Sequence, residues 1–348
     1  FANDFDPVKA GAYRANFPDA TTHFHEGDVW QVDPAGLPRG ADLAWASSPC
    51  QDFSLAGGRA GLAGGRSSAF FGFWRLIEAL GEAAPRTVVI ENVSGLLTSH
   101  AGEDFTALCQ ALSAQGYRFG ALEIDAARFL PQSRPRVFVI ATRAAVAGRL
   151  MGDSPFHTRA VREAQARLPA HLAESWIWWR GEAPARRNAD LASLLEPDAA
   201  LPWHSPERTA RLLDLMAPLH RARLEAARAS GARTVGAVFR RMRVEDGRRV
   251  QRAEARFDGL AGCLRTPRGG SSRQTLIVAE GGMVRSRLIS PREGARLMGL
   301  PDSYVLPAAA TSALHVVGDG VAAPVVRWLA AEILEPLLAP ARAVIAAE

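Results

Sequence analysis

Short apolar segments alternate with amphipathic helical patterns over about the first 145 residues, and this alternation constrains the fold more than any other feature. Short apolar runs at 42–46, 87–90 and 137–142 predict buried parallel strands. Between them, residues 69–82 and 104–115 repeat apolar side chains at helical spacing. This alternation predicts an α/β fold with a doubly wound, mostly parallel sheet and a ligand site at the carboxyl ends of its strands.

The rest of the chain has a weaker pattern. An aromatic cluster at 175–180 is more typical of packing than of base stacking. Further expected elements are a helical segment at 202–230, short strands at 234–239 and 275–278, and helices at 287–306 and 324–335, the last ended by Pro336.

Length and composition are those of a folded protein of two domains, or of one large domain with an insertion. The chain has 348 residues, of which 48% are hydrophobic and 22% charged. It has no run of about 18 apolar residues, so we expect no membrane span, and we find no signal-peptide pattern. The scattered cysteines, Cys50, Cys109 and Cys263, predict neither a disulfide framework nor a metal site, which favours a cytoplasmic setting.

Positive charge is concentrated between Trp203 and Arg287, although the net charge of the chain is only +5. This segment contains 18 Arg against 8 Asp and Glu, a local charge of +10, while the remainder carries −5. A basic segment on a slightly acidic body is typical of a module that binds a polyanion such as nucleic acid. Solvated Arg-rich helices can have the same composition.

Three motifs with reactive or charged side chains lie at the ends of the predicted strands. Cys50 follows the first strand, where a partly exposed thiol can act as a nucleophile, although a lone cysteine is more often an inert core residue. Glu91 ends the second strand, and a buried glutamate can hold a proton at neutral pH. Arg134 and Arg136 precede the third strand, where two guanidinium groups can bind a carbonyl or a phosphate. A solvated glutamate and a surface arginine pair would give the same pattern.

In this order, the three motifs resemble those of the cytosine-C5 DNA methyltransferase family. Residues 2–6, 26–29, 287–293 and 318–324 are similar to further motifs of the same family, in the same sequence order. The matches cover roughly residues 1–145 and 285–330.

Two departures from the family pattern matter. The family begins with a glycine-rich strand and turn that cradles the methionine part of the cofactor, and this sequence begins after it. We expect about 20–30 further residues there, the length of one strand-turn-helix unit. At position 319 the family usually has Asn, and Asp319 would weaken one amide hydrogen bond without abolishing the motif.

The resemblance implies that S-adenosylmethionine is the cofactor and S-adenosylhomocysteine the product. Asp4 would bind the ribose hydroxyls, as acids do in nucleotide-binding sheets, and Asp28 the adenine amino group. The other cofactor contacts that the resemblance implies are Phe5, Val29, Ser48, Pro49, Asp319 and Val321.

The resemblance also implies a mechanism. Cys50 would add to C6 of cytosine, Glu91 would protonate or share a proton with N3, and Arg136, with Arg134, would hold the O2 carbonyl. Because stacking covers C6 in a duplex, the cytosine would have to be flipped out of the helix.

By the same resemblance, a smaller target recognition domain at 196–287 is inserted between a catalytic, cofactor-binding domain at 1–195 and a C-terminal part at 288–348 that returns to it. The expected contacts to duplex DNA are Gln51, Arg265, Arg268, Ser271, Ser272 and Arg273.

Other functions are open to such a chain. An RNA (tRNA) cytosine-C5 methyltransferase fits the size and charge of the +10 segment less well, and a catalytically inactive DNA-binding protein would not need Cys50, Glu91 and Arg136. A thiol hydrolase lacks a histidine partner in these motifs. We interpret the sequence as a bacterial, site-specific DNA cytosine-C5 methyltransferase that is cytoplasmic and monomeric. A cognate restriction endonuclease would be a further partner of such an enzyme.

Overall fold

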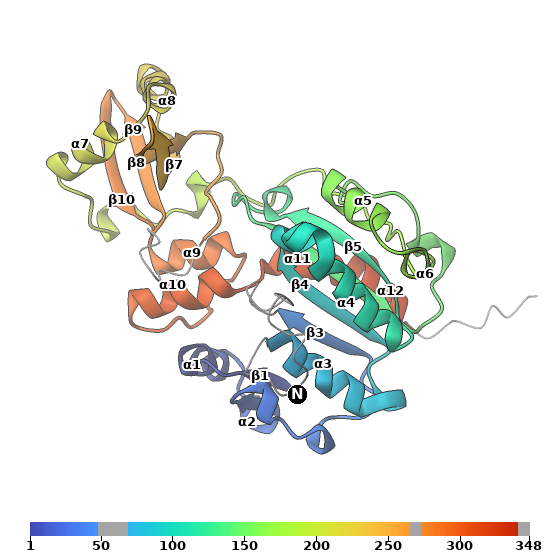
Figure 1. Ribbon diagram of the computed structural model, residues 1–348. Helices are drawn as coiled ribbons and strands as arrows, with labels where there is room; N and C mark the ends of the chain where they lie inside the picture. The colour runs from blue at the N-terminus through green and yellow to red at the C-terminus, as the bar shows by residue number, and fades with distance from the viewer. Residues whose placement is uncertain (48–68, 265–272, 340–348) are drawn as a thin grey trace, which may run out of the picture.

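Three β-sheets organise the protein, for which a computed structural model describes residues 1–47, 69–264 and 273–339. Figure 1 shows a larger lobe that contains the N-terminus and a smaller lobe at the upper left. The larger lobe holds a two-stranded and a four-stranded sheet, and the smaller lobe holds the third, four-stranded sheet.

The four-stranded sheet of the larger lobe has the order β3 (Leu43–Ser47), β4 (Thr87–Val93), β6 (Pro135–Thr142) and β5 (Arg118–Asp125). The three predicted strands are therefore present, and β3 and β4 are parallel as expected. The expected parallel direction of the third is wrong, because β6 runs antiparallel to both β4 and β5. Only residues 126–134 separate β5 from β6, which is too short for the crossover that a parallel pair needs.

Helices cover both faces of this sheet and confirm the α/β class (Figure 1). On one face, α3 (Ala69–Leu80) and α4 (Glu103–Ala114) bury Phe70, Trp74, Phe105 and Leu108 against the strands. Cys109 is fully buried in α4, as a core residue should be, and this burial raises the pKa of its thiol.

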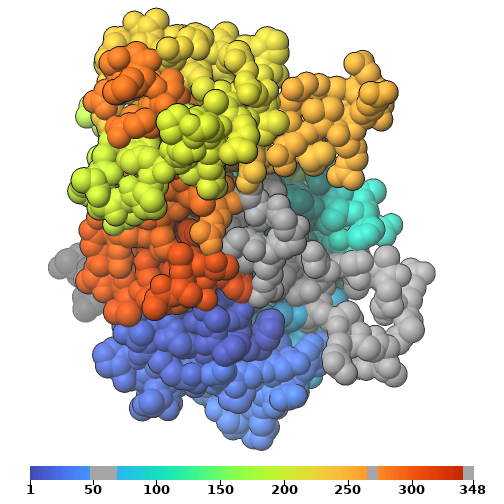
Figure 2. Space-filling view, turned by 90° about the vertical axis from the view of Figure 1, so that its left-hand side faces the viewer, coloured from blue at the N-terminus to red at the C-terminus, as the bar shows by residue number. Residues whose placement is uncertain are grey.

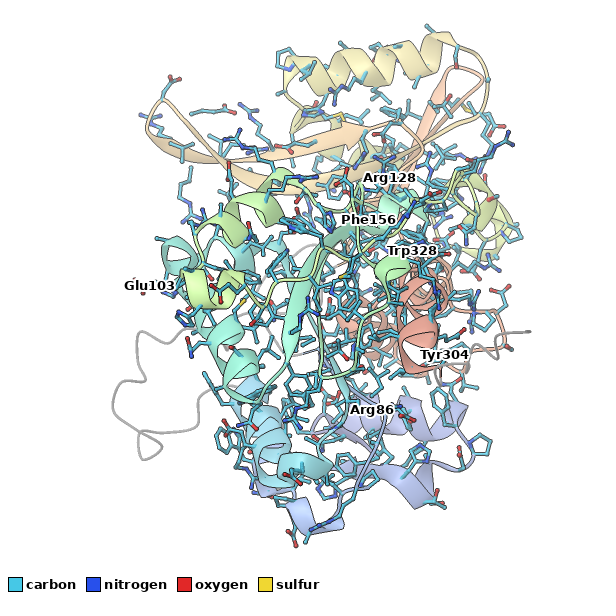
Figure 3. The ribbon with its side chains drawn as sticks, turned by 90° about the vertical axis from the view of Figure 1, so that its right-hand side faces the viewer. Arg86, Glu103, Arg128, Phe156, Tyr304 and Trp328 are labelled. Carbon is cyan, nitrogen blue, oxygen red and sulfur yellow. The ribbon has the colours of Figure 1, made fainter. Side chains whose placement is uncertain are left out.

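The other face is packed by C-terminal helices and by Trp179 of the aromatic cluster, whereas Trp176 packs on the first face against Phe105 and Phe119. The indole of Trp179 is fully buried and donates to the carbonyl of Ile140 at 3.1 Å, so this cluster packs. The rings of Phe156 and Trp328 have centroids 4.9 Å apart, and Figure 3 shows the two labelled side by side. The short helices α5 (Arg159–Ala166) and α6 (Ala170–Ala173) pack instead on the face covered by α3 and α4, where Val161, Ala164 and Leu172 join the same core.

The N-terminal segment forms a small parallel sheet of β1 (Ala2–Asp4) and β2 (Phe24–Glu26). Between them lie α1 (Pro7–Asn16), capped by Asp6, and α2 (Ala20–His23). A C-terminal helix, α10 (Ala310–Asp319), lies against α1, where Lys9 Nζ and Asp319 Oδ2 are 2.9 Å apart.

The smaller lobe has its own sheet and its own core. Its strands, in the order of the sheet, are β10 (Met283–Leu288), β9 (Thr275–Glu280), β7 (Thr234–Glu245) and β8 (Arg248–Arg256). The predicted single helical segment is two helices, α7 (Pro206–Asp214) and α8 (Pro218–Ala229), because Pro218 starts a new helix. A separate apolar cluster joins these helices to the sheet through Leu212, Met216, Leu224, Val238, Ala253, Ala255 and Ile277.

Two predicted C-terminal helices have different limits in the structure. α9 (Pro291–Leu297) is shorter than expected because Gly299, with φ of 76°, ends it. The last helix is longer: α11 (Ala323–Leu329) continues through a π-helical segment, 330–334, into α12 (Glu335–Leu338). The expectation that Pro336 ends it is wrong, since Pro336 lies in the first turn of α12.

Candidate active site

Three described residues of the sequence motifs, Ser47, Glu91 and Arg136, lie at one edge of the larger sheet. Ser47, the last residue of β3, lies beside Glu91 of the parallel strand β4. Because β6 is antiparallel to β4, its first residues lie at the same edge, and Arg136 is opposite Val93. Cys50 follows Ser47 by three positions but lies outside the described residues. The reversed direction of β6 therefore brings Arg136 to Glu91.

Glu91 and Arg136 form a buried ion pair at this edge. Arg136 Nε is 3.1 Å from Glu91 Oε1, and Glu91 is only 7% exposed. Ser47 also contributes a side-chain hydrogen bond to Glu91. Burial raises the pKa of Glu91 above its usual value, although the charges of Arg136 and then Arg134 oppose this effect. The carboxyl group therefore keeps its proton to a higher pH than an ordinary glutamate does.

Arg134 has different partners from Arg136. Its guanidinium group donates to the carbonyls of Leu264 at 3.0 Å, Gly318 at 2.9 Å and Gly320 at 2.8 Å. Its side chain is buried, and this burial lowers the pKa of Arg134. Arg134 therefore links the start of β6 to the chain that returns from the smaller lobe and to the end of α10. The three carbonyls accept from both terminal nitrogens of its guanidinium group.

Sequence reasoning did not place two residues that lie in the same site. Cys263 Sγ is 3.4 Å from Arg134 Nη1 and 4.0 Å from Arg136 Nη2. Gln132 is fully buried, donates to the carbonyl of Leu297 at 2.6 Å and accepts from the amide of Leu264 at 3.1 Å. All four contacts join residues more than 100 positions apart, so no local pattern could have indicated them.

The acids predicted to bind the cofactor lie at the carboxyl ends of neighbouring strands. Asp4 ends β1 and accepts from the amide of Asp6 at 2.9 Å, while Asp28 follows β2 and accepts from the amide of Trp30 at 3.0 Å. The ring of Phe5 between them in sequence is 69% exposed. Two carboxylates and an apolar ring at one sheet edge fit the hydroxyl, amine and flat-ring chemistry of a nucleoside.

The remaining predicted residues are placed as follows. Asp319 pairs with Lys9, and Val321 packs against the core of the larger lobe. Val29 lies in a 3₁₀ turn after Asp28. Arg273 donates to Thr311 Oγ1 of α10 at 2.5 Å. The predicted residues that lie outside the described part of the chain are Ser48, Pro49, Gln51, Arg265, Arg268, Ser271 and Ser272.

In the part of the chain that the structure describes, no three His, Cys, Asp or Glu side chains come together as a metal site. Nor does any helix among these residues have the length and apolar character needed to cross a membrane.

These features define a class: an α/β protein with two acids at the carboxyl ends of a small parallel sheet, a buried Glu–Arg pair and a separate basic lobe. The family model for C-5 cytosine-specific DNA methylase matches residues 1–335. The chain belongs to this family, which confirms the family predicted from the motifs.

Individual relatives agree with this family. The type II methyltransferase M1.ScrFI of Lactococcus lactis subsp. cremoris is 24% identical over 97% of this chain and 72% of its own length. The type II methyltransferase M.NlaX of Neisseria lactamica is 26% identical over 97% of this chain and 89% of its own. An orphan methyltransferase, M.SPRI of Bacillus phage SPR, is 39% identical over 34% of this chain and 26% of its own.

Solved structures support the fold. The Dnmt2 methyltransferase of S. pombe superimposes with a TM-score of 0.54 at 16% identity, over 97% of this chain and 90% of that one. The methyltransferase EhMeth of Entamoeba histolytica gives a TM-score of 0.55 at 11% identity over the same shares. At these identities the likeness concerns the fold alone, and it agrees with the predicted methyltransferase fold.

Proposed function

We propose a residue-level account of how this protein, by its family a DNA cytosine-C5 methyltransferase, carries out its reaction on duplex DNA. The observation that carries the account is the buried Glu91–Arg136 pair, 3.1 Å apart, at the sheet edge where the segment containing Cys50 begins. S-adenosylmethionine, when bound, supplies the methyl group.

The proposed nucleophile is Cys50, by its match to the family motif. C5 of cytosine is a poor nucleophile, and a thiolate that adds to C6 makes C5 electron-rich enough to accept a methyl group. After methylation, loss of the C5 proton to a base or to water lets the thiolate leave, which restores the ring and the free cysteine.

Glu91 and Arg136 offset the charge that builds on the ring during this addition. A protonated Glu91 can donate to N3, and its raised pKa supports that protonation state. Arg136 contacts Glu91 through Nε and donates from Nη1 to the carbonyl of Pro135 at 2.8 Å, so we assign Nη2, which has only the 4.0 Å contact to Cys263 Sγ, to orient the O2 carbonyl. Both groups would act best in a site from which water is excluded.

We assign Arg134 a positioning role rather than the shared O2 contact that the sequence predicted. Its contacts to Leu264, Gly318 and Gly320 support this assignment, since they hold the two chain segments that border the site. Its charge also contributes to the electrostatic environment of Glu91.

For the cofactor, we propose that Asp4 binds the ribose and Asp28 the adenine amino group, with Phe5 against the flat ring. The position of both acids after neighbouring parallel strands supports this. Val29, Ser48, Pro49, Asp319 and Val321 remain the other proposed contacts.

We propose that residues 196–287 form the target recognition domain, with 1–195 and 288–348 as the catalytic part. The separate sheet and apolar cluster of the smaller lobe support this division, and its charge of +10 between Trp203 and Arg287 supports duplex DNA as the partner. A monomeric, cytoplasmic state and an accompanying restriction endonuclease stay predictions.

The deciding experiment is transfer of labelled methyl from S-adenosylmethionine to unmethylated duplex DNA by the full-length protein, compared with its Cys50→Ala variant. We expect label at C5 of cytosine, lost in C50A, and a covalent protein–DNA complex with 5-fluorocytosine duplex only when Cys50 is present. Cys109→Ala, a change of a core thiol, is the matched control. Label on tRNA but not on DNA would contradict the proposal.

A further inference from the structure

We propose that a two-stranded ribbon of the smaller lobe, residues 239–254 of β7 and β8, enters a groove of duplex DNA beside the target cytosine. This inference rests on the proposed function, and it adds a described element to the DNA contacts that the resemblance implies, which are Gln51 and residues within 265–273.

The ribbon extends beyond its sheet. β9 pairs with β7 only from Thr234 to Val238, whereas β7 continues to pair with β8 up to Glu245 opposite Arg248. Figures 2 and 3, seen from opposite sides, both show these strands projecting from the lobe, and Figure 3 shows them passing the end of α8. Its tip is a two-residue turn, Asp246-Gly247, with φ of 48° and 76°, which matches the twist of the paired strands.

One face of the ribbon is lined with arginine. Because side chains alternate along a strand, Arg241, Arg243, Arg248 and Arg252 share this face with Glu245 and Glu254. Arg243 Nε is 2.6 Å from Glu254 Oε1, Arg241 Nε is 3.6 Å from Glu254 Oε2, and Arg252 Nε is 2.8 Å from Glu245 Oε1. The side chains of Arg241 and Arg243 are 53% and 48% exposed. Their guanidinium groups are thus held in place but remain open to solvent.

This arginine face lies on the side of the candidate active site. Phe239 is the first residue of this face. A Cβ added to Gly262 would lie only 1.8 Å from the Phe239 ring, so the chain that leads back to the larger lobe passes close to this face. The amide of Ala261 donates to Pro131 O at 2.8 Å, and the next residue but one is Cys263, beside Arg134. The opposite face packs on α7 and α8 through Val238, Ala253 and Ala255.

A duplex DNA groove matches this shape and charge. The major groove, about 12 Å wide, admits a two-stranded ribbon, and arginine is the side chain that most often contacts guanine edges there. Arginines on the same face can also bind phosphates, which fix the position of the protein. The major groove of an RNA helix is too deep and narrow for side chains to read. The geometry therefore favours DNA over RNA.

The test compares the double variant R241Q/R243Q with R211Q/R223Q, which removes the same charge from exposed positions on α7 and α8. Duplex affinity is measured by fluorescence anisotropy over a range of salt, together with kcat, KM and S-adenosylmethionine affinity. We expect the ribbon variant to raise Kd about ten- to a hundredfold and to reduce the salt slope by about one to two. Its kcat at saturating DNA and its cofactor affinity should stay within about twofold of wild type, as should all values for the control.

A second ribbon variant, R248Q at the tip of the arginine face, leaves the ion pairs of Glu245 and Glu254 intact, so its result does not depend on their loss. It should weaken DNA binding in the same direction. Equal duplex affinity in the ribbon and control variants, or a loss confined to structured RNA, would overturn the inference. If wild type itself methylates no cytosine, the proposed function fails instead, so the two failures are distinguishable.

Discussion

At the scale of single residues, neighbouring charged groups in the site differ in what surrounds them. Arg134 and Arg136 are two positions apart, yet three backbone carbonyls hold the first and a buried carboxyl group holds the second. Residue type and spacing predicted that both would lie near the site. They could not assign the two roles, because the acceptors come from positions 264, 318 and 320.

Glu91→Gln tests the proposed proton donor at this scale. An amide cannot donate the proton, so we expect kcat to fall by roughly 10²- to 10⁴-fold. Because the pKa of Glu91 is raised, wild-type kcat should decline as pH rises through that value, where the carboxyl group loses its proton. The variant should lack this decline. Glu78→Gln, an exposed change on α3, is the control, and an unchanged pH profile in E91Q would exclude the role.

At the scale of elements, the sequence predicted a strand that is buried on both faces better than a strand that is polar on one face. β4 is an apolar run and was predicted, whereas β8, RRVQRAEAR, was not, because arginine lines one of its faces. The direction of β6 also could not be predicted, since it depends on pairing with β5, which the sequence pattern did not reveal.

A glycine is required at position 262 because the chain that leads back to the larger lobe passes very close to β7 there. A Cβ there would lie 1.8 Å from the Phe239 ring, so Gly262→Ala must displace either the ring or the chain. We expect a loss of about 1–3 kcal/mol in the free energy of unfolding and a higher KM for DNA. Gly148→Ala, which has open space around it, is the control. Equal denaturant unfolding of the two variants would contradict this expectation.

At the scale of the whole molecule, the two chain crossings between the lobes meet at one buried ion pair. Arg287, at the end of β10, and Glu293 of α9 are both fully buried, with Arg287 Nη2 2.6 Å from Glu293 Oε1. The amide of Glu196, in the chain that leads into the smaller lobe, donates to the same carboxylate at 2.9 Å. The entry and the exit of the smaller lobe are therefore held together by Glu293.

Glu293→Gln should destabilise the molecule strongly, because it leaves the charge of Arg287 buried without its counterion. We expect the free energy of unfolding to fall by about 3–5 kcal/mol. Asp302→Asn breaks an exposed pair with Arg296 and should cost less than about 1 kcal/mol. Chemical denaturation of both variants checks the contrast, and similar losses would show that Glu293 is not the joint between the lobes.

The carboxylates on the ribbon also have a consequence for how fast the enzyme finds its site. Under the proposed role, each arginine bound to Glu245 or Glu254 must exchange that partner for a phosphate or a base, so a contact to arbitrary DNA gains little free energy. Residence at wrong sequences should then be brief. Only a site that offers guanine edges in the right register would hold the ribbon long enough for a cytosine to leave the stack, so these two glutamates would speed the search along a chromosome.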